Sequence, residues 1–189
     1  MNLAKLFETQ RKLDERIVKE KGLEGQDLLP LKILALQVEL GELANEWRGF
    51  KFWSEDREPR TAQRNYARGS GKTIPPYIIT NPLLEEYVDC LHFILSIGLE
   101  VDALNVTAFE SIVKFGAYPN RNMIFVFNKL FAEIGMMGND ERSVALEYYP
   151  YVFQWFLELG CLLGFTWEQI EQAYYAKNQI NQERQDGGY

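Results

Sequence analysis

Two pairs of carboxylates with the same i, i+3 spacing place the strongest constraint on how this chain can fold. Glu39 and Glu42 form one pair, Glu86 and Asp89 form the other, and each pair lies in an apolar run with helical period. Residues three apart share one face of a helix, so each pair presents two acids to the same side. Like charges in a partly desolvated cleft repel one another. A hard divalent cation such as Mg²⁺, which binds carboxylate, water and phosphate oxygens, would remove that repulsion.

Such spacing is also common on solvated helix faces, where the acids have no further role. Both pairs in this chain are flanked by apolar residues, which favours the metal site over a solvated surface.

The overall charge agrees with a metal-assisted reaction on an anionic substrate. The chain carries 20 basic and 27 acidic residues, for a net charge of −7. Nucleic-acid binding requires a basic surface, so we expect no nucleic-acid partner. One histidine and two cysteines cannot build the usual tetrahedral zinc site. No apolar run reaches the about 18 residues of a membrane span, and no signal peptide is visible, so we expect a cytoplasmic protein without a membrane partner.

The apolar pattern predicts an all-α helical bundle, with residues 1–189 forming a single domain. The segment 54–80 is polar and contains Pro59, Pro75 and Pro76, so we expect it to be a long mobile connection. Thr166 and Gln169 predict a capping box at the start of the last helix. Pro150 should kink or divide the helix that contains it. The expected helices span about 3–21, 30–47, 83–99, 102–115, 122–136, 142–163 and 166–186.

Three further features lie near the acid pairs in the sequence. An aromatic segment that includes Trp53 and encloses Lys51 follows the first pair, and it could form core or stack on a base. His92 lies one turn after Asp89, where it could be a core residue or line a site. Near the C-terminus, a stripe of amide and cationic side chains at i, i+4 and i+7 suits an anionic ligand such as a nucleoside triphosphate, or is simply solvated. The stripe consists of Lys177, Asn181 and Arg184.

The two acid pairs together resemble the signature of the all-α nucleoside triphosphate pyrophosphatases, the MazG-like superfamily. Residues 10–14, 46–53 and 86–93 and the ending 177–189 are similar to the dimeric dUTPase branch of that superfamily. One departure is Asp14, at a position where this branch often has Asn.

The resemblance implies a homodimer that hydrolyses dUTP, and also dUDP, to dUMP with release of pyrophosphate or phosphate. It implies Mg²⁺ as cofactor, with Glu39, Glu42, Glu86 and Asp89 as ligands, and Glu39 as the general base. The charged face of the tail and its hinge-like Gly187-Gly188 also predict that the segment 177–189 closes over bound nucleotide. The residues expected to contact substrate are Gln10, Asp14, Lys51, Trp53, His92, Lys177, Asn181, Arg184 and Tyr189.

Two alternatives remain open at this stage. A related pyrophosphatase could act on dCTP or on several nucleoside triphosphates. A non-catalytic helical protein could instead bind nucleotides or mediate interactions, with its acids serving only as solvated surface.

Overall fold

The computed structural model describes residues 2–66, 77–103, 113, 116, 121–138 and 141–187. Most of these residues are helical, and the predicted all-α fold is confirmed. The elements are α1 (Leu3–Lys21), α2 (Leu29–Trp47), β1 (Gln63–Tyr66), β2 (Tyr77–Thr80), α3 (Pro82–Glu100), α5 (Met123–Met137), α6 (Arg142–Leu162) and α7 (Trp167–Asp186).

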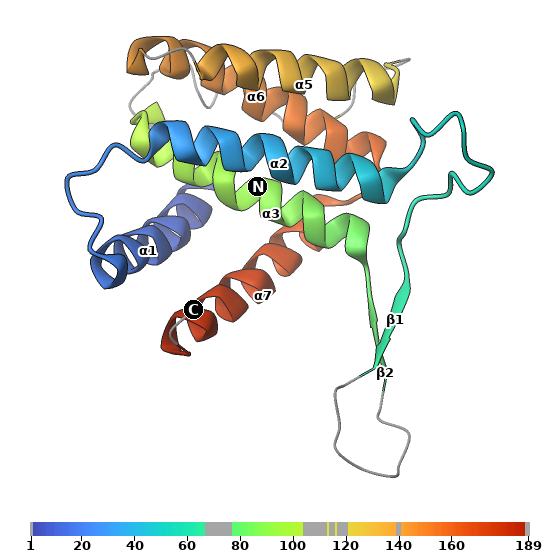
Figure 1. Cartoon of the computed structure of the whole chain (residues 1–189), viewed down its shortest axis with the longest axis horizontal. Coiled ribbons are helices and arrows are strands. Elements are labelled where there is room, and N and C mark those ends of the chain that lie inside the picture. Colours follow the sequence, from blue (N-terminus) through green and yellow to red (C-terminus); the bar gives the residue numbers. More distant parts are fainter. Residues whose placement is uncertain are drawn as a thin grey trace.

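Helix α3 lies at the centre of the bundle and packs against α1, α2, α6 and α7. Figure 1 shows α2 running antiparallel beside it, with α5 and α6 on one side of this pair and α1 and α7 on the other. The apolar positions of α3 are buried along its whole length, which agrees with contacts on several sides. Because α2 and α3 each carry one acid pair, their contact decides how the pairs face one another.

Local signals set where the helices begin. The Asn81 side chain accepts a hydrogen bond from the Leu84 backbone N–H at 3.1 Å, and Pro82 occupies the first turn, where its missing N–H has no cost. The predicted capping box of Thr166 and Gln169 is present at the start of α7. Helix α6 runs through Pro150 without being divided.

Two tyrosines fix α3 against α6 in a reciprocal way. Tyr87 of α3 lies over Gly160 of α6 and donates to an α6 backbone carbonyl at 3.0 Å. Tyr149 of α6 lies over Gly98 of α3 and donates to an α3 carbonyl at 3.0 Å. A Cβ atom at either glycine would lie within 2.4 Å of the facing phenol oxygen, so only glycine permits this approach. The contact holds the helix that carries the second acid pair at a defined distance from its neighbours.

The segment 54–80 differs from the expected irregular connection. Residues 63–66 and 77–80 within it pair as antiparallel strands, with Gln63 opposite Thr80, and the sequence did not predict this pairing. β2 consists of aromatic and β-branched residues that favour strands. Its partner is polar, and each strand is too short to show a clear alternation. The predicted mobility of the connection is untested, and the helix expected at 102–115 lies almost wholly outside the described residues.

Within the ranges that the structure describes, no helix combines the length and apolar character needed to cross a membrane.

Candidate active site

Three of the predicted metal ligands lie together where α2 faces α3. Glu39, Glu42 and Glu86 each offer a carboxylate oxygen, and these oxygens all lie within 4.8 Å of one another. The i, i+3 spacing places the first two on one face of α2, and the antiparallel packing brings Glu86 of α3 opposite them. A cluster of hard oxygen donors with one exposed and two half-buried members fits a divalent cation such as Mg²⁺ that retains water ligands.

Two members of the acid cluster, Glu39 and Glu86, resist ionisation when no cation is bound. Burial, followed by the charges of Asp89 and Glu42, raises the pKa of Glu39 to about 6. Burial and the neighbouring carboxylates, Asp89 first, raise the pKa of Glu86 to about 7. Both shifts arise first from burial and then from like charges placed side by side. A bound cation would reverse the repulsion, so the residues present fit the metal that the sequence predicts.

Asp89, the fourth predicted ligand, lies beside this cluster but has a different partner. Its Oδ2 accepts a hydrogen bond from Lys177 Nζ at 2.6 Å, and both side chains are about one-fifth exposed. Its charge still reaches Glu39 and Glu86, because it contributes to the raised pKa of each. The structure therefore joins Lys177, a predicted substrate contact on α7, directly to the predicted metal site.

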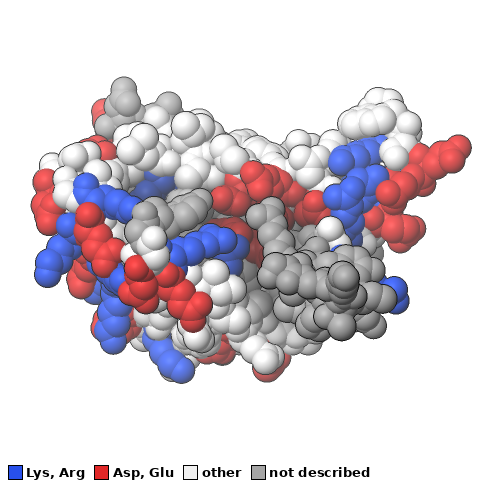
Figure 2. All heavy atoms as spheres, turned by 60° about the horizontal axis from the view of Figure 1, so that its bottom comes forward, with Lys and Arg blue, Asp and Glu red and all other residues white. Residues whose placement is uncertain are grey.

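A cavity of about 330 Å³ opens next to the acid cluster, between α1, α2, α3 and α7. This volume is at the lower end of small-molecule sites. Apolar side chains form part of its wall, namely Leu13, Ile17, Val18, Leu28 and Phe93. Predicted site residues form much of the rest, namely Gln10, Asp14, Glu39, Asp89, His92, Lys177, Asn181 and Arg184. Figure 2 shows Asp and Glu side chains gathered in the middle of this side of the molecule, with Lys and Arg side chains beside them.

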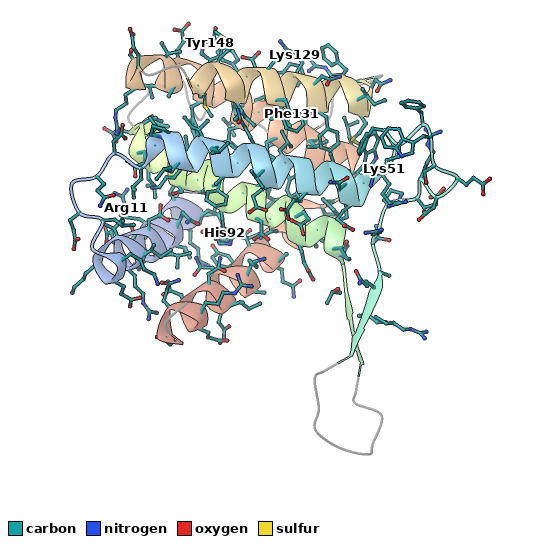
Figure 3. The ribbon with its side chains drawn as sticks, in the orientation of Figure 1. Arg11, Lys51, His92, Lys129, Phe131 and Tyr148 are labelled. Carbon is teal, nitrogen blue, oxygen red and sulfur yellow. The ribbon has the colours of Figure 1, made fainter. Side chains whose placement is uncertain are left out.

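The polar wall of the cavity is a connected hydrogen-bond network. Gln10 Nε2 donates to Asp14 Oδ1 at 2.8 Å, while Gln10 Oε1 lies 2.8 Å from His92 Nδ1 and accepts from the Tyr174 hydroxyl at 3.0 Å. The His92 ring stacks on Tyr174, and Figure 3 shows His92 between α1 and α7. Burial, with a smaller effect of the Lys177 charge, lowers the pKa of His92 to about 3, so its ring is neutral at physiological pH.

Two polar residues of the cavity wall, Ser96 and Lys32, were not among the predicted site residues. Ser96 donates to Asp14 Oδ2 at 2.5 Å. Lys32 places Nζ 2.6 Å from Glu100 Oε1 and 3.7 Å from Asp14 Oδ2, and its side chain is only 14% exposed. Helical spacing could have found both, because Ser96 is four residues after His92 and Lys32 is seven residues before Glu39.

Lys51 and Trp53 do not line the cavity of their own chain. Trp53 is 66% exposed and makes edge contacts with Phe50 and Phe52, while Lys51 Nζ lies 5.6 Å above the Phe50 ring. Helix α2 ends at Trp47, and the chain then turns away from α3 and α7 (Figure 3). Substrate contact by Lys51 and Trp53 remains a prediction.

The C-terminal segment is helical as far as Asp186 and is fastened to α1. Arg16 of α1 donates to the backbone carbonyl of Gln182 at 3.1 Å and to Asp186 Oδ1 at 2.5 Å. Asn181 and Arg184 extend from this helix into the cavity wall. Tyr189 lies outside the described residues, and closure of the tail over a nucleotide stays a prediction.

A family model described as dUTPase matches residues 2–66 and 76–189, which is nearly the whole chain. The chain belongs to the all-α dimeric dUTPase family. Membership indicates dUTP diphosphatase activity, with dUTP as substrate. Enzymes of this family generally depend on a divalent metal, which agrees with the acid cluster. A search among curated proteins found no match.

We expect Glu86→Gln to stabilise the metal-free protein at high pH. The pKa of Glu86 is raised from 4.5 to about 7, so its protonated form favours the fold, and this contribution is lost as pH rises between these values. The variant avoids the loss. At pH 8 its free energy of unfolding without metal should exceed that of the wild type by about 1 kcal/mol, allowing for solvent screening, with no gain near pH 4.5.

Urea unfolding in a chelator at both pH values measures this difference, and Mg²⁺ should then stabilise the wild type far more than the variant. Glu85→Gln, one residue away on the exposed side of α3, is the matched control and should behave as the wild type. Equal pH dependence in wild type and Glu86→Gln would contradict the repulsion described here.

Proposed function

We propose that the chain catalyses the Mg²⁺-dependent hydrolysis of dUTP, and of dUDP, to dUMP with release of pyrophosphate or phosphate. The observation that carries the proposal is the double position of Glu39, which belongs both to the acid cluster and to the wall of the adjacent cavity. A ligand whose base fills the cavity therefore meets the carboxylates with its phosphates. Nucleoside polyphosphates combine these two chemistries in one molecule.

The carboxylates of Glu39, Glu42, Glu86 and Asp89 would hold the metal. Bound Mg²⁺ would offset the charge of the phosphates and lower the pKa of a water molecule. Glu39 would accept the proton of the attacking water at a carboxylate oxygen, as general base. Its pKa of about 6 without metal reflects burial first, and then the neighbouring carboxylates whose charge a cation would screen.

Lys177 is the residue of this chain that would connect the substrate with the carboxylates. In the structure its ammonium group is paired with Asp89. When Asp89 joins the other carboxylates, Lys177 Nζ becomes available to donate to a phosphate oxygen. Arg184, two turns further along the same face of α7, would donate as well. The ion pair thus holds both groups ready without leaving either charge unpaired in a partly buried site.

We expect the enzyme to release pyrophosphate from dUTP only with Mg²⁺ and to use dCTP and dTTP far less well. A polar site that pairs with one base edge rejects cytosine, which leaves its groups unpaired, whereas thymine, which has the same edge, has to be rejected at its methyl group. Glu39→Gln, Glu42→Gln, Glu86→Gln and Asp89→Asn should each lower kcat by about a hundredfold or more, because each removes a charge but keeps the shape.

A coupled pyrophosphate assay measures these rates, and far-UV circular dichroism checks that the helices are retained. Glu85→Gln is again the control and should keep wild-type turnover. Comparable use of dUTP, dCTP and dTTP would favour a broader pyrophosphatase. Near-normal turnover in two of the four variants would contradict the metal site.

We also propose that two copies of the chain associate through an apolar face formed by α2 and α5. On α2 this face contains Leu31, Leu34 and Val38, each more than half exposed, and on α5 it contains Ile124 and Phe131. Helices α2 and α5 pack together (Figure 1). A groove lined by both continues the face. Contiguous exposed apolar surface of this kind marks an interaction site, and none of these positions carries a charge.

Leu34→Glu should convert the dimer to a monomer, because each dimer would bury two unpaired carboxylates at its interface. Analytical ultracentrifugation at micromolar concentration measures the outcome. Ile180→Glu makes the same kind of change at a 45% exposed position on α7 and should leave the dimer intact. A monomeric wild type, or a dimeric Leu34→Glu variant, would show that this face is not the interface.

A further inference from the structure

One buried nitrogen atom of a residue in the cavity wall, Nε2 of His92, has no hydrogen-bond partner among the residues that the structure describes. His92 is 6% exposed, and its Nε2 atom is buried without a hydrogen bond. His92 lines the cavity, so a ligand there that displaces the side chains covering Nε2 can supply the missing partner. A buried polar atom left unpaired has a cost of about 1–3 kcal/mol, so its position is a strong indication of where a ligand binds. Whether Nε2 donates or accepts depends on the tautomer of the ring.

The charge of Asp14 determines that tautomer through Gln10. Gln10 Nε2 lies 2.8 Å from Asp14 Oδ1, and an ionised carboxylate can only accept. The amide oxygen of Gln10 must therefore point the other way, toward His92 Nδ1 and the Tyr174 hydroxyl. An amide oxygen also only accepts, so the proton of the neutral ring lies on Nδ1 and the lone pair lies on Nε2.

Lys32 is the residue that keeps Asp14 ionised. Burial raises the pKa of Asp14, and the charge of Lys32 is the largest effect that lowers it. Lys32 Nζ is held in place by Glu100 at 2.6 Å and lies 3.7 Å from Asp14 Oδ2, while the Ser96 hydroxyl donates to the same oxygen. A buried carboxylate needs such partners to remain charged.

We propose that Lys32 and Asp14 act as positioning residues that hold His92 in its Nδ1–H tautomer, so that Nε2 accepts the N3–H of a bound uracil. The identity of the base rests on the proposed function. Uracil carries a proton on N3, whereas cytosine carries a lone pair there. A fixed acceptor therefore pairs with uracil and repels cytosine. Thymine has the same N3–H, so its rejection must come from the apolar wall around its methyl group.

The tautomer can be read directly, because His92 is the one histidine of the chain. In protein labelled with ¹⁵N-histidine, a two-bond ¹⁵N–¹H correlation spectrum of the free enzyme should show a protonated Nδ1 and an unprotonated Nε2. A dUMP titration should then shift the Nε2 resonance as it gains a hydrogen bond. A protonated Nε2 in the free enzyme would overturn the proposal without bearing on whether dUTP is the substrate.

Lys32→Met keeps the length of the side chain and removes its charge. Without that charge Asp14 takes up a proton more readily, donates to Gln10, and turns the amide, so the Nδ1–H tautomer is no longer fixed. The ratio of kcat/KM for dUTP over dCTP should fall by about three- to tenfold, mainly through KM for dUTP, and the Nε2 signal should move toward its protonated position.

Lys32→Arg retains the charge and should restore both readouts. Lys12→Met, at an exposed position of α1, should change neither. A wild-type tautomer and wild-type selectivity in Lys32→Met would overturn the role of Lys32. A free enzyme with the expected tautomer but equal use of dUTP and dCTP would overturn the role of Nε2 in choosing the base.

Discussion

Repulsion among three clustered carboxylates, two of them half-buried, is the constraint on which the rest of this structure depends. Glu39, Glu42 and Glu86 are brought within 4.8 Å of one another by the packing of α2 on α3. Burial, followed by the charges of Asp89 and the other carboxylates, raises the pKa values of Glu39 and Glu86. A fold gains nothing from such an arrangement by itself. The apolar contacts of α3 with four other helices, and its reciprocal Tyr–Gly contacts with α6, hold the acids together against their repulsion. A bound cation would remove this repulsion, and the free energy released would add to the affinity for the cation and its phosphate ligand.

The same helices also form the cavity beside the acids, and the polar groups of its wall hydrogen-bond to one another. Glu39 belongs to both regions, and Lys177 pairs with Asp89 at their boundary. On the far wall, Lys32, Asp14, Gln10 and His92 form a sequence of contacts in which each group fixes the direction of the next. One side of the cavity is thus suited to charge and the other to a single edge of a base. Family membership indicates dUTP as the molecule that meets both requirements.

Much of this could be predicted from the sequence, because helical period and local capping are short-range properties. The period predicted most of the described helices, and Thr166 predicted the start of α7. The i, i+3 acid pairs predicted three carboxylates that do lie together. The strands were not predicted, since four residues are too few to show an alternation.

Contacts between distant segments were also beyond reach of the pattern. The Lys177–Asp89 pair joins residues 88 positions apart, and Lys32 reaches Asp14 across two helices. Lys32 lies on the same helix face as Glu39, but its burial could not be read from that spacing, because burial depends on how α1, α2 and α3 meet. The resemblance pointed to Lys51 and Trp53, yet the turn after α2 carries them away from the cavity of their own chain. These placements follow from tertiary packing, which no single segment encodes.

Calorimetric titration with a non-hydrolysable α,β-imido analogue of dUTP tests the central claim most directly. If metal and nucleotide relieve the repulsion between the carboxylates, binding should require Mg²⁺. Affinity should increase as pH rises through about 6 and about 7, where Glu39 and Glu86 lose their protons, and binding below that range should release protons to the buffer. Tight binding in a chelator, with the same affinity and no proton release from pH 5 to pH 8, would contradict the account.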